Sequence, residues 1–235
     1  MKAIILNSGK GSRLKDLTKD KPKSMVSISE NETIFSKAIK ILSQFPINEF
    51  IISTGYLNNV LKDYILSNFP DLKFKFIHNP EYDSTNYIKS INYIPDDFDD
   101  DIILLHGDLI FDYEVADKIL NNENSCVVVD SSLEIPEKDF KARVENNSVK
   151  MISVKIFTDD VVACQPFYKI KNDDWKLWKE NIRKYCDNGN DKVYAEEALN
   201  ELTDTLFIEA LDMKGYFCSE VDTVEDLERV KEIID

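Results

Sequence analysis

The first hundred residues alternate short hydrophobic runs with segments in which hydrophobic residues recur every three or four positions. The runs predict β-strands, and the spaced segments predict amphipathic helices. The expected strands are 3–6, 25–28, 50–52, 72–77 and 102–105, and the expected helices are 33–45, 60–69 and 86–94. The last of these strands, Ile-Ile-Leu-Leu, has no polar position, which is typical of a central strand buried on both faces.

The pattern is less regular after residue 110. We expect strands at 126–130, 140–145, 149–155, 161–167 and 206–211, and helices at 172–187, 194–202 and 224–234. The pair Asn146-Asn147 lies between two of these strands and predicts a hairpin turn. The acidic run 95–101 is expected to be an exposed loop, and no linker-like stretch or internal repeat divides the chain.

Strands that alternate with helices favour parallel pairing, because each helix carries the chain back over the sheet. We therefore predict an α/β fold with a mostly parallel, Rossmann-like mixed sheet, helices on both faces and a small antiparallel extension. A chain of 235 residues allows one domain or at most two. We predict a single domain over residues 1–235.

The formal net charge is −15, from 29 basic and 44 acidic residues. This balance argues against a general nucleic-acid binder or a protein of anionic membrane surfaces, because both need a positive surface. Residues 1–25 are the exception, with seven basic and two acidic residues and hence a local charge of +5. The local excess predicts either an anion-binding site or a solvated, lysine-rich loop.

The chain has four cysteines, without a C-x-x-C pair, and two histidines. These counts and spacings do not predict a zinc site, and we expect reduced, mostly buried thiols. The opening hydrophobic stretch already turns polar at Asn7, which is too early for a signal peptide. No run approaches the roughly 18 apolar residues of a membrane span. We therefore expect a cytoplasmic protein with no membrane partner.

A loop with two glycines follows the first expected strand, where ligands of open α/β sheets bind. Its small residues would let the backbone approach a polyphosphate, and its two basic side chains would add positive charge. The spacing is not that of a Walker A loop, and the third glycine of a dinucleotide fingerprint is missing. By itself the loop predicts either a phosphate cradle or a plain turn. It reads Asn7-Ser8-Gly9-Lys10-Gly11-Ser12-Arg13.

A second motif follows at 18–23, where Pro22 restricts the backbone before Lys23 and so aims that side chain. Together, L-x-x-G-x-G-[ST]-R-L at 6–14 and T-x-x-x-P-K at 18–23 resemble the nucleotidyltransferase family that makes nucleotide-activated sugars and alcohols. The family's usual opening is L-A-A-G-x-G-[ST]-R-[LM]. Asn7 and Ser8 replace its two alanines, so the base preference stays open.

Two aspartates match the metal ligands of the resembled family. Asp108 follows the strand 102–105 within Leu-His-Gly-Asp, and Asp222 comes just before the last expected helix. The resemblance implies that both hold Mg²⁺, an ion that prefers oxygen ligands. By its position alone, Asp222 could equally cap that helix.

The resemblance also implies a reaction in which a nucleoside triphosphate and a phosphate monoester give a nucleotide-linked product and pyrophosphate. Because the attack brings two anions together, cations must neutralise their charge and hold them in line. We expect Lys23 to act on the reacting phosphates and Arg13 on the departing pyrophosphate, as catalytic residues. The expected nucleotide-binding residues are Leu6, Asn7, Ser8, Gly9, Lys10, Gly11, Ser12, Arg13, Asn86 and Asp108.

Residues 79–90 resemble the N-P-x-Y-x-x-x-N-x-x-S-[IL] segment of small cytidylyltransferases that act on phosphocholine or 2-aminoethylphosphonate. On this resemblance Asn86 meets the nucleotide or the acceptor, although it could also cap the next helix. The resemblance is thin between 110 and 218, and this region must shape the acceptor pocket. The expected acceptor-binding residues are Asn86, Lys155, Tyr194 and Glu196.

We therefore expect a Mg²⁺-dependent cytidylyltransferase that transfers CMP from CTP to a small phosphorylated acceptor, for a cell-surface polysaccharide precursor. The acceptor would be phosphocholine, an aminoalkylphosphonate, or a phosphorylated amino acid or amide. Residues 1–110 would form the nucleotide-binding half, and 111–235 the acceptor-binding half with the closing helix. The alternatives are a sugar-1-phosphate nucleotidyltransferase that uses UTP or dTTP, and a non-catalytic nucleotide-binding homologue. We expect a monomer or homodimer with no nucleic-acid partner.

Overall fold

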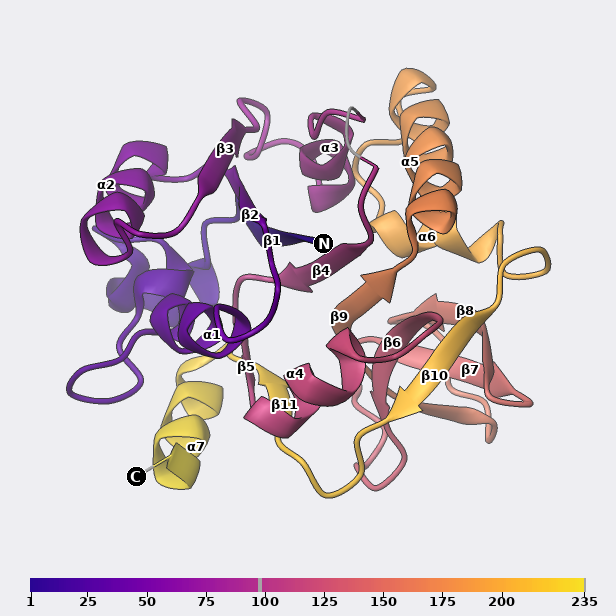
Figure 1. The fold of residues 1–235 in the computed structure, drawn as a ribbon. Coiled ribbons are helices and arrows are strands. Elements are labelled where there is room, and N and C mark those ends of the chain that lie inside the picture. The colour runs from indigo at the N-terminus through magenta and orange to yellow at the C-terminus, as the bar shows by residue number, and fades with distance from the viewer. Residues whose placement is uncertain (97–98, 235) are drawn as a thin grey trace.

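A computed structural model describes residues 1–96 and 99–234. Its main feature is a nine-stranded mixed sheet with the order β3-β2-β1-β4-β9-β6-β10-β8-β7, covered by helices (Figure 1). The strands are β1 (Lys2–Asn7), β2 (Glu49–Thr54), β3 (Phe74–His78), β4 (Ile102–His106), β5 (Leu109–Phe111), β6 (Ser125–Asp130), β7 (Lys141–Glu145), β8 (Ser148–Ser153), β9 (Val161–Ile170), β10 (Ile208–Asp212) and β11 (Cys218–Glu220). The α-helices are α1 (Ile34–Leu42), α2 (Asn58–Asn68), α3 (Tyr87–Asn92), α4 (Tyr113–Leu120), α5 (Asn172–Asp187), α6 (Ala195–Asn200) and α7 (Val224–Ile234).

The first half of the sheet is parallel, as predicted. Strands β3, β2, β1 and β4 run in one direction, with β1 between β2 and β4. Leu6, the next-to-last residue of β1, faces His106, the last residue of β4, so both strands end at the same level. This register brings the loops that follow β1 and β4 together at one edge of the sheet.

The second half contains the antiparallel extension. Strand β9 is antiparallel to both β4 and β6. Strand β7 pairs with β8 and also with the start of β9, so the strands from β9 round to β7 close on themselves. Asn146 and Asn147 have φ values of 51° and 63°, the left-handed conformation of a two-residue hairpin turn, which confirms the predicted turn.

Helices cover both faces of the sheet. The face over α3, α5 and α6 buries a cluster that includes Trp175 and Trp178, which are 2% and 0% exposed. The face over α1, α2 and α4 buries a second cluster, with Phe35 of α1 almost fully covered. Burial of each such side chain contributes about 2–3 kcal/mol of hydrophobic free energy. The two clusters therefore hold the sheet rigid beneath its loops.

A third, smaller hydrophobic cluster joins the two ends of the chain. Leu227 and Val230 of α7 pack with Leu14 and Val26 from the segment after β1. A short two-stranded sheet, β5 with β11, runs from the end of β4 to the residues just before α7. These contacts hold α7 against the segment that follows β1. Asp222, just before α7, therefore lies beside the loop after β1.

One expected element is wrong and three elements were missed. The strand expected at 25–28 is wrong: Lys23–Met25 form a 3₁₀ turn, η2, after Pro22. The three-residue strands β5 and β11 are too short to show a clear period, while α4, which buries Val115, Ala116, Ile119 and Leu120 at helical spacing, was missed although its pattern was present. Residues 97–98 of the run expected to be an exposed loop lie outside the described residues.

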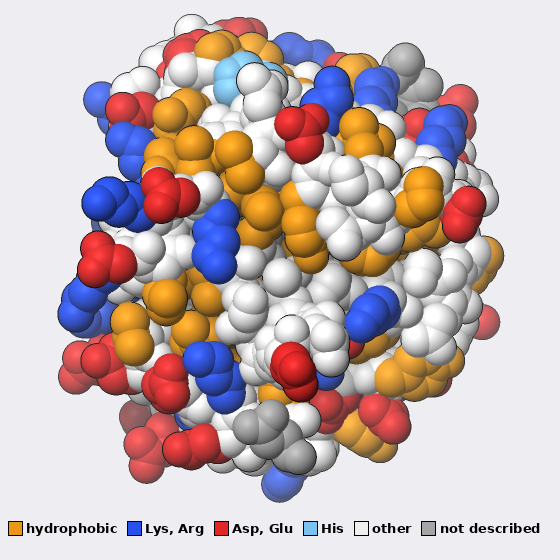
Figure 2. Space-filling view, turned by 90° about the vertical axis from the view of Figure 1, so that its left-hand side faces the viewer, with side chains coloured by type: hydrophobic (Ala, Val, Ile, Leu, Met, Phe, Trp, Pro, Cys, Tyr) orange, Lys and Arg blue, Asp and Glu red, His pale blue; other side chains and the backbone are white. Residues whose placement is uncertain are grey.

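The outer edge of the sheet is protected by charge. Strand β3 is the edge strand, with Lys73 just before it and Lys75 within it, and lysines on an edge discourage pairing with another chain. On the face that carries α2 and β3, basic and acidic side chains are interspersed with scattered hydrophobic ones (Figure 2). In the described part of the chain, no helix is long and apolar enough to span a membrane.

Candidate active site

A cavity of about 290 Å³ lies where β1 and β4 end. The loop after β1 forms one wall, the 3₁₀ turn η2 forms another, and Gly107, Asp108 and Asp222 complete it. This first cavity therefore brings together residues from the start, the middle and the end of the chain. Of the predicted nucleotide-binding residues, it is lined by Leu6, Asn7, Gly9, Lys10, Gly11, Ser12, Arg13 and Asp108.

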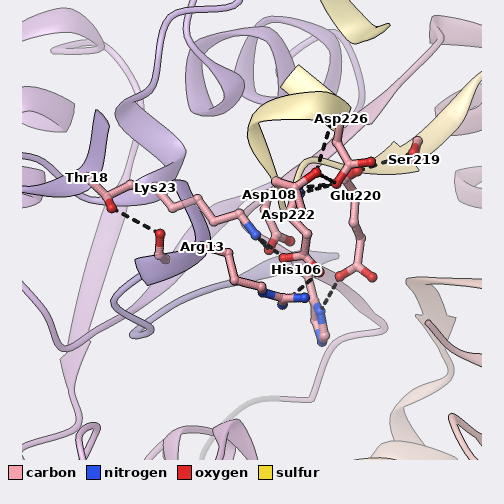
Figure 3. A network of polar contacts seen from close by, with 11 residues as sticks. Arg13, Thr18, Lys23, His106, Asp108, Ser219, Glu220, Asp222 and Asp226 are labelled. Atoms are coloured by element: carbon pink, nitrogen blue, oxygen red, sulfur yellow. Dashed lines mark hydrogen bonds and ion pairs between the residues drawn. The ribbon is translucent and has the colours of Figure 1, made fainter. Parts of the chain in front are cut away.

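The loop after β1 is shaped by Gly11 and Thr18. Gly11 has φ 62° and ψ 32°, which a residue with a side chain adopts only with strain. The Thr18 hydroxyl donates to the Gly11 carbonyl at 3.0 Å, so the first residue of the T-x-x-x-P-K motif holds the loop in place (Figure 3). A Cβ atom at Gly11 would lie 2.7 Å from the Cβ of Lys23, so the glycine also makes room for that lysine.

Lys23 joins the two predicted metal ligands. Its Nζ donates to Asp108 Oδ2 at 2.6 Å and also to Asp222 Oδ1, so one ammonium group contacts both carboxylates (Figure 3). Burial lowers the pKa of Lys23, but the two carboxylates outweigh burial and raise it above its usual value. For Asp108 the signs are reversed: burial raises the pKa of the carboxyl, and the nearby charge of Lys23 outweighs burial and lowers that pKa below its usual value. Lys23 and Asp108 are therefore both charged at neutral pH.

Asp222 does not cap α7, although its position just before this helix would allow it. The helix start is capped by Thr223 and Asp226 instead: Thr223 Oγ1 accepts from the Asp226 N–H at 3.1 Å, and Asp226 Oδ2 accepts from the Asp222 and Thr223 N–H groups. The carboxylate of Asp222 points to Lys23 and to Arg13, whose Nη2 lies 2.8 Å from Asp222 Oδ2. Arg13 itself is largely exposed at the mouth of the cavity.

A second cavity of about 190 Å³ adjoins the first and shares Leu6, Gly9 and Asp108 with it. Beneath it the Ser8 hydroxyl bonds Ser90 Oγ at 2.8 Å, and Asn79 Nδ2 donates to the same Ser90 hydroxyl at 3.0 Å. This network ties the end of β1 to the N-P-x-Y segment at 79–90. The predicted residues that line the second cavity are Leu6, Ser8, Gly9, Asn86 and Asp108.

Asn86 caps α3 and also lines the second cavity, while its contact with nucleotide or acceptor stays a prediction. Its Oδ1 accepts from the Tyr87 N–H at 2.7 Å, which caps α3, and its side chain lines the second cavity. Lys10 reaches the same segment through an ion pair with Asp83. The two sequence segments that carry the family resemblance are therefore in direct contact.

The predicted acceptor residues are dispersed. Tyr194 packs its ring 5.8 Å from the ring of Tyr87, a residue of the second cavity. Glu196 is 1% exposed and accepts hydrogen bonds from Tyr87 Oη and, at 2.8 Å, from Tyr168 Oη, so it lies behind Tyr87 and lines neither cavity. Lys155 is exposed after β8 and also lines neither cavity.

Three site residues were missed by the sequence reasoning. His106 lines the second cavity, packs its ring 4.6 Å from that of Tyr87, and bonds Glu220 Oε1 through Nδ1 at 3.0 Å. Ligand atoms of Asp139, Glu220 and Asp222 lie within 4.8 Å of one another. His106 and Glu220 are the last residues of β4 and β11, two positions before Asp108 and Asp222, so polar residues at expected strand ends are a usable signal. Asp139 lies in an irregular loop without any such signal.

The site fits a divalent cation that binds oxygen. Asp108 Oδ1 is buried without a hydrogen-bond partner, while its other oxygen contacts Lys23. Asp108 and Asp222 both contact Lys23 Nζ, and a ligand atom of Asp108 also lies within 4.8 Å of those of His106 and Glu220. No cysteine lines either cavity within the described residues. A set rich in carboxylates and without thiols suits Mg²⁺ better than a metal that prefers sulfur.

The comparisons with known proteins agree with this geometry. A sequence model described as nucleotidyl transferase matches residues 2–131, which is more than half of the chain. The chain belongs to the nucleotidyl transferase family. It is 31% identical to the CTP:phosphoglutamine cytidylyltransferase of Campylobacter jejuni over 255 aligned residues, which cover 97% of this chain and 98% of that protein.

Solved structures of this family share the fold. The inositol-1-phosphate CTP transferase of T. maritima superposes with a TM-score of 0.81 at 20% identity, covering 99% of this chain and 94% of that one. The CTP:phosphocholine cytidylyltransferase of Streptococcus pneumoniae superposes with a TM-score of 0.77 at 20% identity, covering 100% and 99%. The predicted mixed α/β fold of a nucleotidyl transferase is thereby confirmed.

Proposed function

We propose that this nucleotidyl transferase is a cytidylyltransferase that moves CMP from CTP to a small phosphorylated acceptor and releases pyrophosphate. One observation carries the proposal: Asp108 and Asp222 meet at Lys23 beside the glycine loop. The choice of CTP is supported by the similarity to the Campylobacter jejuni enzyme, which extends over almost the whole of both chains. By the same similarity, the acceptor is a small phosphorylated amide, amine or amino acid rather than a sugar phosphate.

The cavity residues suit the transfer of a nucleotidyl group between two charged substrates. Lys23 and Arg13 supply the positive charge that holds two sets of phosphates against each other. The left-handed turn at Gly11 leaves the backbone close to the cavity, where its N–H groups can meet a pyrophosphate. A phosphate acceptor is already ionised near neutral pH, so the chain needs no general base.

Mg²⁺ is the cofactor of this proposal, and Asp108 and Asp222 would hold it. When bound, the ion would neutralise the charge of the reacting phosphates and act as a template for their alignment. The unpaired Oδ1 of Asp108 is open to such an ion. Both oxygens of Asp222 already contact cationic side chains, so an ion there would share this carboxylate with Lys23 and Arg13.

The decisive experiment is a pyrophosphate-release assay with ATP, CTP, GTP, UTP and dTTP. Each is paired with phosphocholine, 2-aminoethylphosphonate, phosphoglutamine and glucose 1-phosphate, with Mg²⁺ or with EDTA. We expect turnover with CTP and one of the nitrogen-containing acceptors, and only with Mg²⁺. The product should be identified by mass as the CMP derivative of that acceptor.

Other outcomes separate the alternatives. Turnover with UTP or dTTP and glucose 1-phosphate would make the protein a sugar-1-phosphate nucleotidyltransferase. Thermal stabilisation by CTP without pyrophosphate from any pair would indicate a nucleotide-binding homologue without catalysis. The complete set of Lys23, Asp108 and Asp222 in one cavity favours a working enzyme over this last alternative.

A further inference from the structure

Two polar side chains of the first cavity have no assigned contact so far: Asn7, which belongs to the expected nucleotide-binding loop, and Ser24, which follows Lys23. Asn7 and Ser24 both line this cavity and are 8% and 2% exposed. Asn7 Nδ2 and Ser24 Oγ are buried, and neither has a hydrogen-bond partner among the described residues. The third such atom in the same cavity is Asp108 Oδ1.

The three groups come from separate parts of the chain, so one local turn does not explain them. Asn7 ends β1, Ser24 follows Lys23 in the turn η2, and Asp108 follows β4. The fold also makes room for the Asn7 side chain. A Cβ atom at position 107 would lie 2.1 Å from Asn7 Oδ1, so the glycine there admits the carboxamide.

Buried polar groups without partners are rare in folded proteins, because each one loses its hydration without compensation. A cluster of three in one cavity indicates that a bound species completes them. The set combines donors, the amide of Asn7 and the hydroxyl of Ser24, with an acceptor, the carboxylate oxygen of Asp108. The ion itself would take Asp108 Oδ1. A water molecule that the ion retains has hydrogens for the Ser24 hydroxyl oxygen and a remaining lone pair for the Asn7 amide.

We propose that Asn7 and Ser24 are positioning residues for the divalent ion, and that they hydrogen-bond water molecules which the ion retains. Mg²⁺ gives up its water reluctantly and keeps several molecules when it binds to one or two carboxylates. Outer partners of this kind orient the ligand and strengthen metal binding. The inference rests on the proposed function, because the ion belongs to that function.

The test measures metal binding without catalysis. Mn²⁺ affinity is determined by electron paramagnetic resonance for the whole protein with α,β-methylene-CTP, for the wild type, Asn7→Ala and Ser24→Ala. We expect each variant to bind Mn²⁺ about 10–100-fold more weakly. Affinity for the same CTP analogue in EDTA, measured by calorimetry, should stay within about twofold, because the proposed contacts go to metal-bound water.

Two further variants control for structural effects. Asn172→Ala removes another carboxamide whose Oδ1 is buried without a partner, at the start of α5 and outside both cavities, and should leave Mn²⁺ affinity unchanged. Asn7→Ser keeps a small polar group at the cavity floor and should recover part of the affinity. Thermal unfolding in EDTA shows that each variant is folded.

The inference is overturned if the wild type binds Mn²⁺ and both alanine variants bind it equally well. It is also overturned if the affinity for the analogue in EDTA falls as much as that for Mn²⁺, because the side chains would then contact the nucleotide itself. Failure of the proposed function looks different: no pyrophosphate would form from any substrate pair, whatever the variants do to metal binding.

Discussion

The two sides of the active site are built in different ways. The phosphate side comes from two short segments, the loop after β1 and the turn η2, and it presents Arg13 and Lys23. The opposite side, around the second cavity, comes mainly from residues 79–108, and Tyr194 and Glu220 contact it from behind through Tyr87 and His106. The chain as a whole is strongly acidic, while residues 1–25 carry a net charge of +5. The proposed phosphate contacts are therefore concentrated near the start of the chain, and the proposed acceptor contacts come from several segments.

The two sides can also be compared by how their polar groups are satisfied. In the first cavity Asn7, Ser24 and Asp108 each leave one buried atom without a partner among the described residues. In the second cavity His106 Nδ1 is bonded to Glu220, and its Nε2 is buried without a partner among the same residues. Behind that cavity Glu196 accepts from two tyrosine hydroxyls, so this carboxylate is enclosed by hydrogen bonds within the protein.

The largest effect expected on the phosphate side is that of Asp108→Ala. The variant loses an ion ligand and one of the two partners of Lys23, so the rate of pyrophosphate release should fall by at least about 10³-fold. Asp212→Asn is the matched control, because Asp212 accepts hydrogen bonds from Ser131 outside both cavities and should keep the wild-type rate. A rate for Asp108→Ala within about tenfold of wild type would remove Asp108 from the reaction.

The next largest effect is expected for Gly11→Ala. The added Cβ would meet the Cβ of Lys23 at 2.7 Å and would displace the lysine, which should lower kcat/KM for CTP by about 10²-fold. Gly189→Ala is the control, since Gly189 also has a positive φ of 77° but a Cβ atom there would have no neighbouring atom within 4 Å. Equal loss of activity in both variants would show that backbone strain alone is responsible.

A smaller effect is expected on the acceptor side from Tyr194→Ala. Loss of this ring beside Tyr87 should raise the KM of the acceptor by about tenfold, which corresponds to about 1.4 kcal/mol, and should leave the KM of CTP unchanged. Tyr113 is a half-exposed tyrosine that stacks on Phe45 and lines neither cavity. Its substitution Tyr113→Ala should change neither the KM of the acceptor nor the KM of CTP. If the KM of CTP rose instead, the division into two sides would be wrong at this residue.

The last expected effect is on stability rather than on activity, and it concerns the contact between the two halves. Lys179 of α5 donates to the Asn92 carbonyl at the end of α3 at 2.9 Å. Although the Asp96 carboxylate lies 3.4 Å from its Nζ, burial lowers the pKa of Lys179 to about 8. The unfolded chain, with an ordinary lysine pKa, then binds more protons than the folded chain between pH 8 and about 10.5.

The free energy of unfolding should therefore rise with pH across this range, by up to about 3 kcal/mol. Lys179→Met should lack this component of the pH dependence. Urea unfolding of both proteins at about pH 7 and about pH 9.5, on either side of the lowered pKa, measures the difference between them. Parallel changes in wild type and variant would show that Lys179 keeps an ordinary pKa in the folded state.

Much of the fold could be predicted from hydrophobic spacing, and the exceptions are instructive. The helix expected at 172–187 and the strand expected at 102–105 are present, because each buries a long and regular set of apolar residues. Residues 25–28 have the composition of a strand but join neither sheet, and Pro22 starts a tight turn there instead. Strand β11 was missed because its three residues gain their stability only from pairing with β5.

In the candidate site, too, some residues could be placed from local sequence and others only from contacts in the fold. The spacing of glycines, Arg13 and Lys23 was readable because the loop and the turn are local structures whose backbone demands specific residues. Asp222 was ambiguous in sequence, since an acidic residue before a helix is an ordinary cap. Only the contact with Lys23, and the capping of α7 by Thr223 and Asp226, decided its place.

The sequence by itself predicted the glycine loop and the parallel core, because these depend on local backbone preferences and hydrophobic period, and the class of reaction followed from its resemblance to a known family. Tertiary structure alone decided how the distant carboxylates meet at Lys23, that Glu196 lies behind Tyr87, and that Asn7 and Ser24 are buried in one cavity without partners among the described residues. The physical reason is that these relations follow from strand order and from packing between α7 and the loop after β1, which join residues about 200 positions apart.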